Sequence, residues 1–195
     1  MSSITEKLDA LLAAFKAKGI DPSNNLRPGL SDAELDAWSS SRGIVLPNDV
    51  RELYRWRNGS VETFAEPQQV FVFRDNGFLS LDDYEQAFSN IDAFLKVLAS
   101  YGVTPPISSQ SVIPIAELEG NYYVVATTSV AGIDYPNPVL CVGEDLAVHF
   151  YSLDSMLDTC LQWVLDPTYS AENQELDNEI DAWEQHNPGV FDIDI

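Results

Sequence analysis

Length, composition and charge restrict what this chain can be. Its 195 residues are 45% hydrophobic, which argues for a folded protein, and a chain of this size buries about 70% of its unfolded surface as one domain. The formal net charge is −21, from 31 acidic and ten basic residues. Because nucleic acids and anionic membranes gain affinity from cationic contacts with phosphate, we expect this protein to bind neither.

The charge is unevenly distributed along the chain. All ten Lys and Arg residues fall at or before Lys96, where 15 acids leave a net charge of −5. The 99 residues that follow hold 16 acids and no Lys or Arg, and they carry −16. Such a surface attracts basic partners over a distance, although an acidic surface that only maintains solubility explains the same distribution.

The first expected element is an amphipathic helix within residues 1–19. This stretch lacks the apolar centre and cleavage site of a secretory signal, and no apolar run in the chain approaches the length of a bilayer. One face of the helix carries its apolar residues at helical spacing, namely Leu8, Leu11, Leu12 and Phe15.

Two capped helices are expected next. Ser31 can cap the first helix while Glu34 reaches back to it, as in a capping box. The second helix, about a dozen residues long, should begin at Pro47, which tolerates the missing N–H of a first turn, and should end at the left-handed pair Asn58-Gly59. Its buried face is expected to consist of Val50, Leu53 and Tyr54.

The middle of the chain combines strand patterns with one long helix. QVFVFR at 69–74 and FLSL at 78–81 flank the turn at 75–77, an arrangement typical of a hairpin. Ser80 then begins the helix, which should end near Gly102. Its apolar positions step by four and three residues through Tyr84, Phe88, Ile91, Leu95 and Leu98.

A meander of about four strands is expected after this helix. The segments 111–118, 121–128, 138–146 and 147–151 are rich in β-branched and aromatic residues. Pro114 favours an edge strand or a strand end because it cannot donate a ladder hydrogen bond. Ser152 then caps a further helix, which should stop near Asp166-Pro167.

The last 26 residues differ from the rest in composition. They hold eight acids and no Lys or Arg, and 171–186 places Leu176, Ile180 and Trp183 on one helical face. A docked final helix and a mobile acidic arm are both compatible with this pattern, and 187–195 resembles an edge strand or an extended tail. We expect residues 1–169 to form the domain and residues 170–195 to be an acidic extension.

Together these elements predict the α+β class. We expect a single domain with a mainly antiparallel sheet of about five or six strands, packed with N-terminal, central and C-terminal helices.

Several motifs in this order resemble the Smi/Knr family of the SUKH superfamily. GLSDAELDAW at 29–38 followed by GIVLPNDVRELYRWRNG at 43–59 is similar to the family's entry motif, and FLSLDDYEQAF, SVIPIAEL and YSLDSMLDTCLQWVL are similar to its later segments. The resemblance covers roughly residues 25–165 and implies a SUKH-like fold. The matched residues are Leu46, Pro47, Tyr54, Asn58, Gly59, Pro114, Ile115, Ser152 and Leu153.

The sequence contains no recognisable catalytic or metal-binding constellation. His149 and His186 have no acid or cysteine at metal-ligand spacing, and H-E-x-x-H, C-x-x-C, P-loop and G-x-S-x-G motifs are absent. We therefore expect no catalytic residue, no metal and no cofactor. Cys141 and Cys160 are expected to be buried free thiols, which favours a cytoplasmic location.

The resemblance implies a non-enzymatic, protein-binding role. Bacterial members of the superfamily are associated with immunity to polymorphic toxins, often nucleases, and fungal relatives with regulation of cell-wall assembly. The acidic surface fits a basic toxin as partner, whereas a regulatory scaffold, or a ligand-binding domain or enzyme with an unidentified site, are the alternatives. The expected contact residues are acids near the sheet and its loops: Glu62, Glu66, Asp75, Asp82, Asp83, Glu117 and Glu119. Oligomeric state is not predicted.

Overall fold

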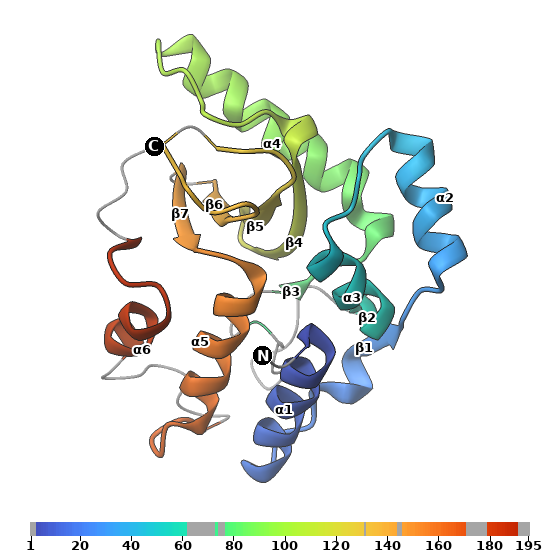
Figure 1. Cartoon of the computed structure of the whole chain (residues 1–195), viewed down its shortest axis with the longest axis vertical. Coiled ribbons are helices and arrows are strands. Elements are labelled where there is room, and N and C mark those ends of the chain that lie inside the picture. The colour runs from blue at the N-terminus through green and yellow to red at the C-terminus, as the bar shows by residue number, and fades with distance from the viewer. Residues whose placement is uncertain are drawn as a thin grey trace.

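The computed structural model describes residues 3–61, 73, 77–130, 132–143, 146–170 and 179–190. Within these residues it contains six α-helices, a five-stranded antiparallel sheet and a two-stranded sheet, which confirms the predicted α+β class (Figure 1). The larger sheet has the strand order β3-β4-β5-β6-β7, so that every neighbouring pair in it is also consecutive along the chain.

The elements have the following bounds. The α-helices are α1 (Ile4–Ala17), α2 (Asp32–Arg42), α3 (Asn48–Trp56), α4 (Tyr84–Ser100), α5 (Leu153–Leu165) and α6 (Glu179–His186). The strands are β1 (Leu26–Pro28), β2 (Arg57–Ser60), β3 (Gly77–Phe78), β4 (Val112–Leu118), β5 (Asn121–Ala126), β6 (Val139–Val142) and β7 (Leu146–Phe150). Short 3-10 turns are η1 (Pro22–Asn25), η2 (Leu81–Asp83) and η3 (Ser109–Ser111).

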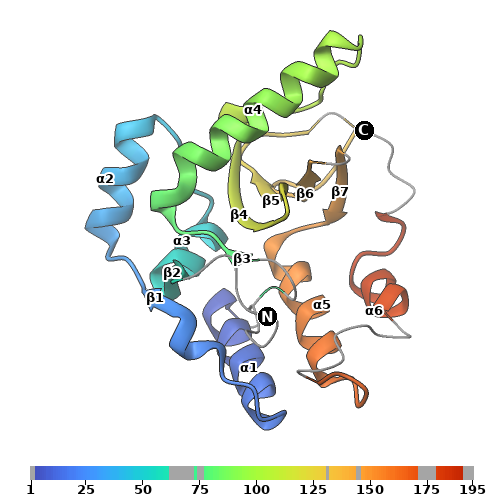
Figure 2. The same cartoon turned by 180° about the vertical axis from the view of Figure 1, so that it is seen from behind.

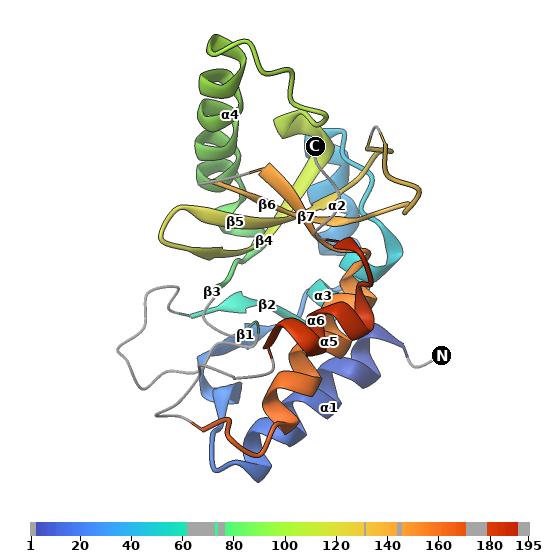
Figure 3. The same cartoon turned by 90° about the vertical axis from the view of Figure 1, so that its left-hand side faces the viewer.

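The helices surround the sheet on several sides. Figure 3 shows α4 on one side of the sheet, rising beyond it, whereas α1 and α5 lie together below the sheet. Seen from behind in Figure 2, α2 and α3 lie beside α4 and the small β1–β2 sheet, and α6 lies on the opposite flank against α5. The core fills the space between these layers, with fully buried side chains that include Leu8, Leu53, Tyr54, Phe78, Ile113 and Phe150.

The capping predictions are confirmed at both Ser31 and Ser152. Ser31 Oγ accepts a hydrogen bond from the Glu34 backbone N–H at 3.3 Å, and Glu34 Oε2 accepts from the Ser31 N–H at 2.8 Å. Ser152 precedes α5 and its Oγ accepts from the Ser155 N–H at 3.1 Å. The predicted apolar face of α1 is also confirmed, because Leu8, Leu11, Leu12 and Phe15 are all buried.

The prediction for the end of α3 is wrong. The helix has nine residues, Pro47 precedes its first residue, and its C-cap is Arg57 in an extended conformation. Gly59 has a positive φ of 79°, as expected, but it lies within β2. Tertiary packing explains the difference: a Cβ on Gly59 would lie 2.7 Å from the Leu79 carbonyl carbon, so the left-handed glycine serves a close approach between two backbone segments.

Pro114 also departs from its predicted position. It lies inside β4, an interior strand that pairs with β3 on one side and β5 on the other. β3 pairs only with Ala116 and Glu117, and the β4–β5 register shifts between Pro114 and Ala116. A proline is tolerated here because the bulge and the short neighbour leave no β3 ladder bond at its nitrogen.

The predicted hairpin at 69–81 is described only in part. Apart from Phe73, which is buried, residues 69–76 lie outside the described residues. Of the predicted second strand, the structure shows Phe78 in β3, while Leu81 begins η2 and leads into α4. The helix prediction from Ser80 is confirmed, because Ser80 precedes η2 and the apolar positions Tyr84, Ile91 and Leu95 are buried.

Of the two alternatives for the C-terminal extension, the structure shows a docked helix, α6, within the described residues 179–190. The Trp183 indole stacks on Phe150 with ring centroids 4.9 Å apart, and it meets Trp163 edge-on at 5.8 Å. Asn187 is fully buried and its Oδ1 accepts from the Tyr151 backbone N–H at 3.0 Å. Ile180, expected on the same apolar face, is 68% exposed, and Leu176 lies outside the described residues.

Candidate protein-binding surface

One face of the motif segment from Gly43 to Gly59 is directed into the protein, and on α3 it consists of Val50, Leu53, Tyr54 and Trp56. Tyr54 is fully buried, and its hydroxyl lies within hydrogen-bond distance of the Leu79 and Pro114 carbonyl oxygens, at 3.3 and 3.4 Å. Burial raises the pKa of this hydroxyl far above its ordinary value, so it is a proton donor at any physiological pH. Tyr54 therefore ties α3 to the segment after β3 and to β4.

The other family-motif residues also have structural contacts. Asn58 is buried, and its Oδ1 accepts from the Leu81 backbone N–H at 3.0 Å. Leu46, Ile115 and Leu153 are buried in the core. These buried motif residues thus hold the fold together.

Most basic side chains make contacts within the protein. Arg51 Nη2 lies 2.8 Å from Asp36 Oδ1, and Arg55 Nε donates to Asp32 Oδ1 at 2.7 Å. The hydrogen bond from Arg55 is the main reason that the pKa of Asp32 lies below its ordinary value. These arginines therefore pair with acids of α2.

Arg57 and Glu52 make other contacts. The Arg57 guanidinium lies 5.2 Å from the centre of the Trp56 ring. The Glu52 carboxylate accepts a hydrogen bond from the Ile4 backbone N–H at 3.1 Å, which joins α3 to α1.

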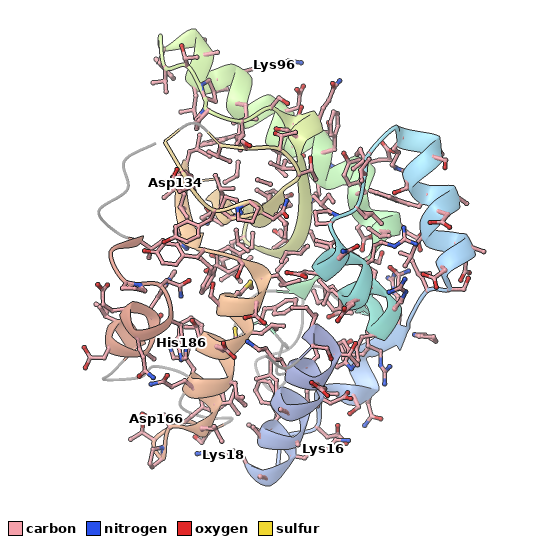
Figure 4. The ribbon with its side chains drawn as sticks, in the orientation of Figure 1. Lys16, Lys18, Lys96, Asp134, Asp166 and His186 are labelled. Atoms are coloured by element: carbon pink, nitrogen blue, oxygen red, sulfur yellow. The ribbon has the colours of Figure 1, made fainter. Side chains whose placement is uncertain are left out.

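The lysines follow the same pattern. Lys7 Nζ lies 2.7 Å from Asp154 and 2.6 Å from Asp158, which fastens α1 to α5. At the other end of these helices, Lys18 donates to the Asp166 carbonyl oxygen at 2.6 Å, and Figure 4 shows the two residues close together. Figure 4 also shows Lys96 at the far end of α4, where its Nζ lies 2.6 Å from Asp92. The bases are largely neutralised, so the acidic surplus determines the sign of the surface.

The predicted contact acids differ in how they are placed. Asp83 accepts from Ser80 Oγ at 2.7 Å and from its backbone N–H, as part of a cap. Glu117 is only 8% exposed, and its Oε1 accepts from the Gly120 N–H at 2.8 Å. Asp82 and Glu119 are exposed to solvent. The remaining candidates, Glu62, Glu66 and Asp75, lie outside the described residues.

One arrangement not predicted from the sequence surrounds Arg42. Its guanidinium lies 4.8 Å from the centre of the Trp38 ring and 5.6 Å from that of Tyr84, and it pairs with Glu85 at 3.0 Å. Of these residues, Arg42, Tyr84 and Glu85 border a hollow of about 310 Å³ between α2 and α4. The four-residue spacing of Trp38 and Arg42 on one helix is the sequence signal from which this contact could have been predicted.

The described residues contain no group of three or more His, Cys, Asp or Glu side chains that could hold a metal ion. The His149 ring packs 5.1 Å from that of Trp183, and His186 Nε2 lies 2.7 Å from Gln162 Oε1. Cys141 and Cys160 are both free and buried, as predicted. None of the helices in the described part of the chain has the length and apolar character needed to cross a bilayer.

The fold and this surface define an α+β domain with an acidic exterior and a motif segment devoted to packing. The profile of the SMI1 / KNR4 family (SUKH-1) matches residues 29–159, and the chain therefore belongs to that family. This confirms the resemblance, with slightly narrower limits than expected, and it indicates a role in protein–protein interaction. Helices α1 and α6 lie outside the matched residues. No curated protein matches the chain.

Proposed function

We propose that this protein is a non-enzymatic immunity protein that neutralises a basic toxin, with a nuclease as the favoured class. The observation that carries the proposal is the charge asymmetry: residues after Lys96 hold 16 acids and no Lys or Arg. The internal ion pairs of Arg51, Arg55 and Lys7 add to it, because they remove bases from the surface. A cytoplasmic location, which the two free thiols favour, would place the protein where such a toxin acts.

The physical argument concerns the partner's chemistry. A nuclease must hold phosphate, so its active site is basic, and an acidic protein can occupy or flank that site. Association between surfaces of opposite sign is fast at low salt and slows as ions screen the charges, with a Debye length of about 8 Å at physiological ionic strength. An immunity protein benefits from this speed because it must capture the toxin before the toxin reaches nucleic acid.

The test is a binding titration against basic nuclease toxins encoded beside this protein's gene. We expect a complex whose dissociation constant rises at least tenfold between about 50 and 500 mM salt, mainly through a slower association rate. We also expect the toxin's nuclease activity to fall in proportion to the complex formed. Tight binding that does not change with salt would contradict the electrostatic argument.

The two alternatives give different results in the same experiments. A regulatory scaffold held through apolar contacts would bind its partner with little salt dependence. The docking of α6 argues against the scaffold hypothesis, because Trp183 packs on Phe150 and is only 8% exposed, which leaves it little apolar surface for a partner. An enzyme would turn over a substrate and would lose this activity when one carboxylate is changed to its amide.

A further inference from the structure

A cavity of about 330 Å³ lies between α4 and the turn that joins β4 to β5. We call it the α4–hairpin cavity. Its apolar lining comes from Ile91 and Phe94 on α4, Tyr122 on β5 and Val142 on β6. This volume is at the low end of the roughly 300–1,000 Å³ typical of ligand pockets, so it suits one long side chain better than a large ligand.

The polar part of the cavity is ordered. Asn90 Nδ2 donates to the Tyr122 hydroxyl at 2.7 Å, and Asn90 Oδ1 accepts from Gln86 Nε2 at 3.0 Å. These bonds fix the aromatic ring of Tyr122 against α4. Among the described lining residues there is no Lys or Arg, and Glu119 supplies the one formal charge.

Glu119 occupies an unusual backbone position. Its φ is +51°, and Gly120 beside it has a φ of +88°. The two residues form the tight connection between Leu118 and Asn121, the last pair of the β4–β5 ladder. Two-residue hairpin turns of this kind require a positive φ at both central residues, and they strongly prefer Asn-Gly or Asp-Gly. Glutamate adopts a positive φ only at an energetic cost. The Glu117 carboxylate, which accepts from the Gly120 N–H, stabilises the turn.

Strain that packing does not require is an indication of function. Nothing in the surroundings demands a glutamate at this position, since Glu119 is exposed and no ion pair involving it occurs among the described residues. The Glu119 side chain is longer than that of aspartate and lies at the mouth of a partly aromatic cavity. Its carboxylate can therefore reach the charged group of a cationic side chain whose apolar stem lies inside the cavity.

We propose that the α4–hairpin cavity binds a cationic side chain, arginine or lysine, of a protein partner. The Glu119 carboxylate pairs with the charged head, and Phe94 and Tyr122 contact the alkyl stem and the face of a guanidinium. The identification of the donor as a basic protein rests on the proposed function. The remaining parts of the proposal rest on the cavity, the strained turn and the Glu119 carboxylate at the cavity mouth.

The experiment uses two small probes that need no partner protein. N-acetyl-arginine methylamide carries the charge and the stem, whereas N-acetyl-norleucine methylamide carries the stem alone. Each is titrated into the full, ¹⁵N-labelled chain, and the amide signals of Gly120, Gly143 and the Asn90 side chain are followed. We expect saturable shifts of these signals with the arginine probe, and affinity for it at least threefold higher than for the norleucine probe.

Three variants separate the contributions. Glu119→Gln should weaken the arginine probe roughly three- to fivefold and leave the norleucine probe unchanged. Phe94→Ala should weaken both probes. Asp181→Asn changes the net charge by the same amount as Glu119→Gln and should alter neither titration, since Asp181 belongs to α6, which packs against α5 and contributes no residue to the cavity lining.

Clear outcomes overturn the inference. Equal affinity for the two probes, absence of shifts around the cavity, or an effect of Asp181→Asn as large as that of Glu119→Gln would each do so. Failure of the proposed function has another signature: the arginine probe binds and Glu119→Gln weakens it, but no basic nuclease forms a complex. A complex that forms and is unaffected by Glu119→Gln supports the proposed function and rejects the cavity as its contact.

Discussion

The backbone adopts a positive φ at both Gly59 and Glu119, but for different reasons. At Gly59 the positive φ is combined with a close approach of the backbone of Leu79 and Ser80, so that a Cβ would collide with it. At the Glu119-Gly120 turn the surroundings are open, and a Cβ on Gly120 would meet nothing within 4 Å. Packing therefore requires a glycine at position 59. Position 119 lies in a surface turn, where packing does not restrict the side chain and binding can determine the residue.

This difference separates the family motif from the candidate contact surface. The motif residues contact one another across α3, β2 and the segment after β3, so substitutions there should reduce stability. Glu119 and its cavity lie on the α4 side of the sheet, where side chains are accessible and a substitution can change binding while the fold persists. Variants of these two regions should therefore change the free energy of unfolding by different amounts, and one variant should increase it.

The largest effect is expected from Gly59→Ala. The new methyl group collides with backbone atoms, and alanine strains a φ of 79°, so the free energy of unfolding should fall by at least about 3 kcal/mol. Gly102→Ala is the matched control: its φ is 84°, but no atom lies within 4 Å, so it should cost only about 1 kcal/mol. Chemical denaturation measures both, and equal losses would contradict the packing explanation.

Tyr54→Phe should have the next largest effect. It removes the hydroxyl that reaches the Leu79 and Pro114 carbonyl oxygens in the core, and it should cost about 1–2 kcal/mol. Tyr101→Phe is the control, since Tyr101 is 81% exposed and should show no change in the unfolding midpoint. If Tyr54→Phe left stability unaltered, the hydroxyl would have no part in joining α3 to β4.

Glu119→Asn should change stability in the opposite direction. Asparagine adopts a positive φ more readily than glutamate, so the variant should be more stable than the parent by about 0.5–1 kcal/mol. It should also lose the charge-dependent part of probe binding, because the shorter neutral amide cannot pair with a cation. Thermal unfolding and the arginine titration are measured on the same sample. A less stable variant would show that the turn carries no strain.

The smallest effect is expected at Asp32, where pH determines its size. Hydrogen bonds from Arg55 and Arg51 keep the pKa of folded Asp32 below its ordinary value of 3.8. This contribution to stability is present above the unfolded pKa and disappears as the pH falls through the folded pKa. The parent should therefore exceed Asp32→Asn in unfolding midpoint at pH 6, and the difference should vanish near pH 2. A difference that persists there would indicate another cause.

Local sequence rules were sufficient for most helices. Ser31 with Glu34 and Ser152 before α5 are capping signals that depend on a few neighbouring residues, and the structure confirms them. Periodicity was equally informative for α1 and α4. The family assignment also came from the sequence, because the motif residues are constrained by the core in which they lie.

Long-range contacts account for the predictions that failed. Gly59 was expected to end α3, and only the approach of residues 79–80 explains its place in β2. Pro114 was expected at an edge, and the brevity of β3 together with the bulge makes an interior position possible. The cluster of Arg42, Trp38 and Tyr84 joins α2 to α4, two helices whose relative placement no local pattern specifies.

The sequence by itself determined the caps at Ser31 and Ser152, the α+β class, the family and the acidic excess, because each depends on local spacing or on composition. Tertiary structure decided which charges remain exposed. Arg51, Arg55 and Lys7 find their acids across element boundaries, and Glu117 turns toward its own hairpin while Glu119 remains at the mouth of a cavity. Pairing and burial are properties of distances in space, and these distances are set only when the helices pack against the sheet.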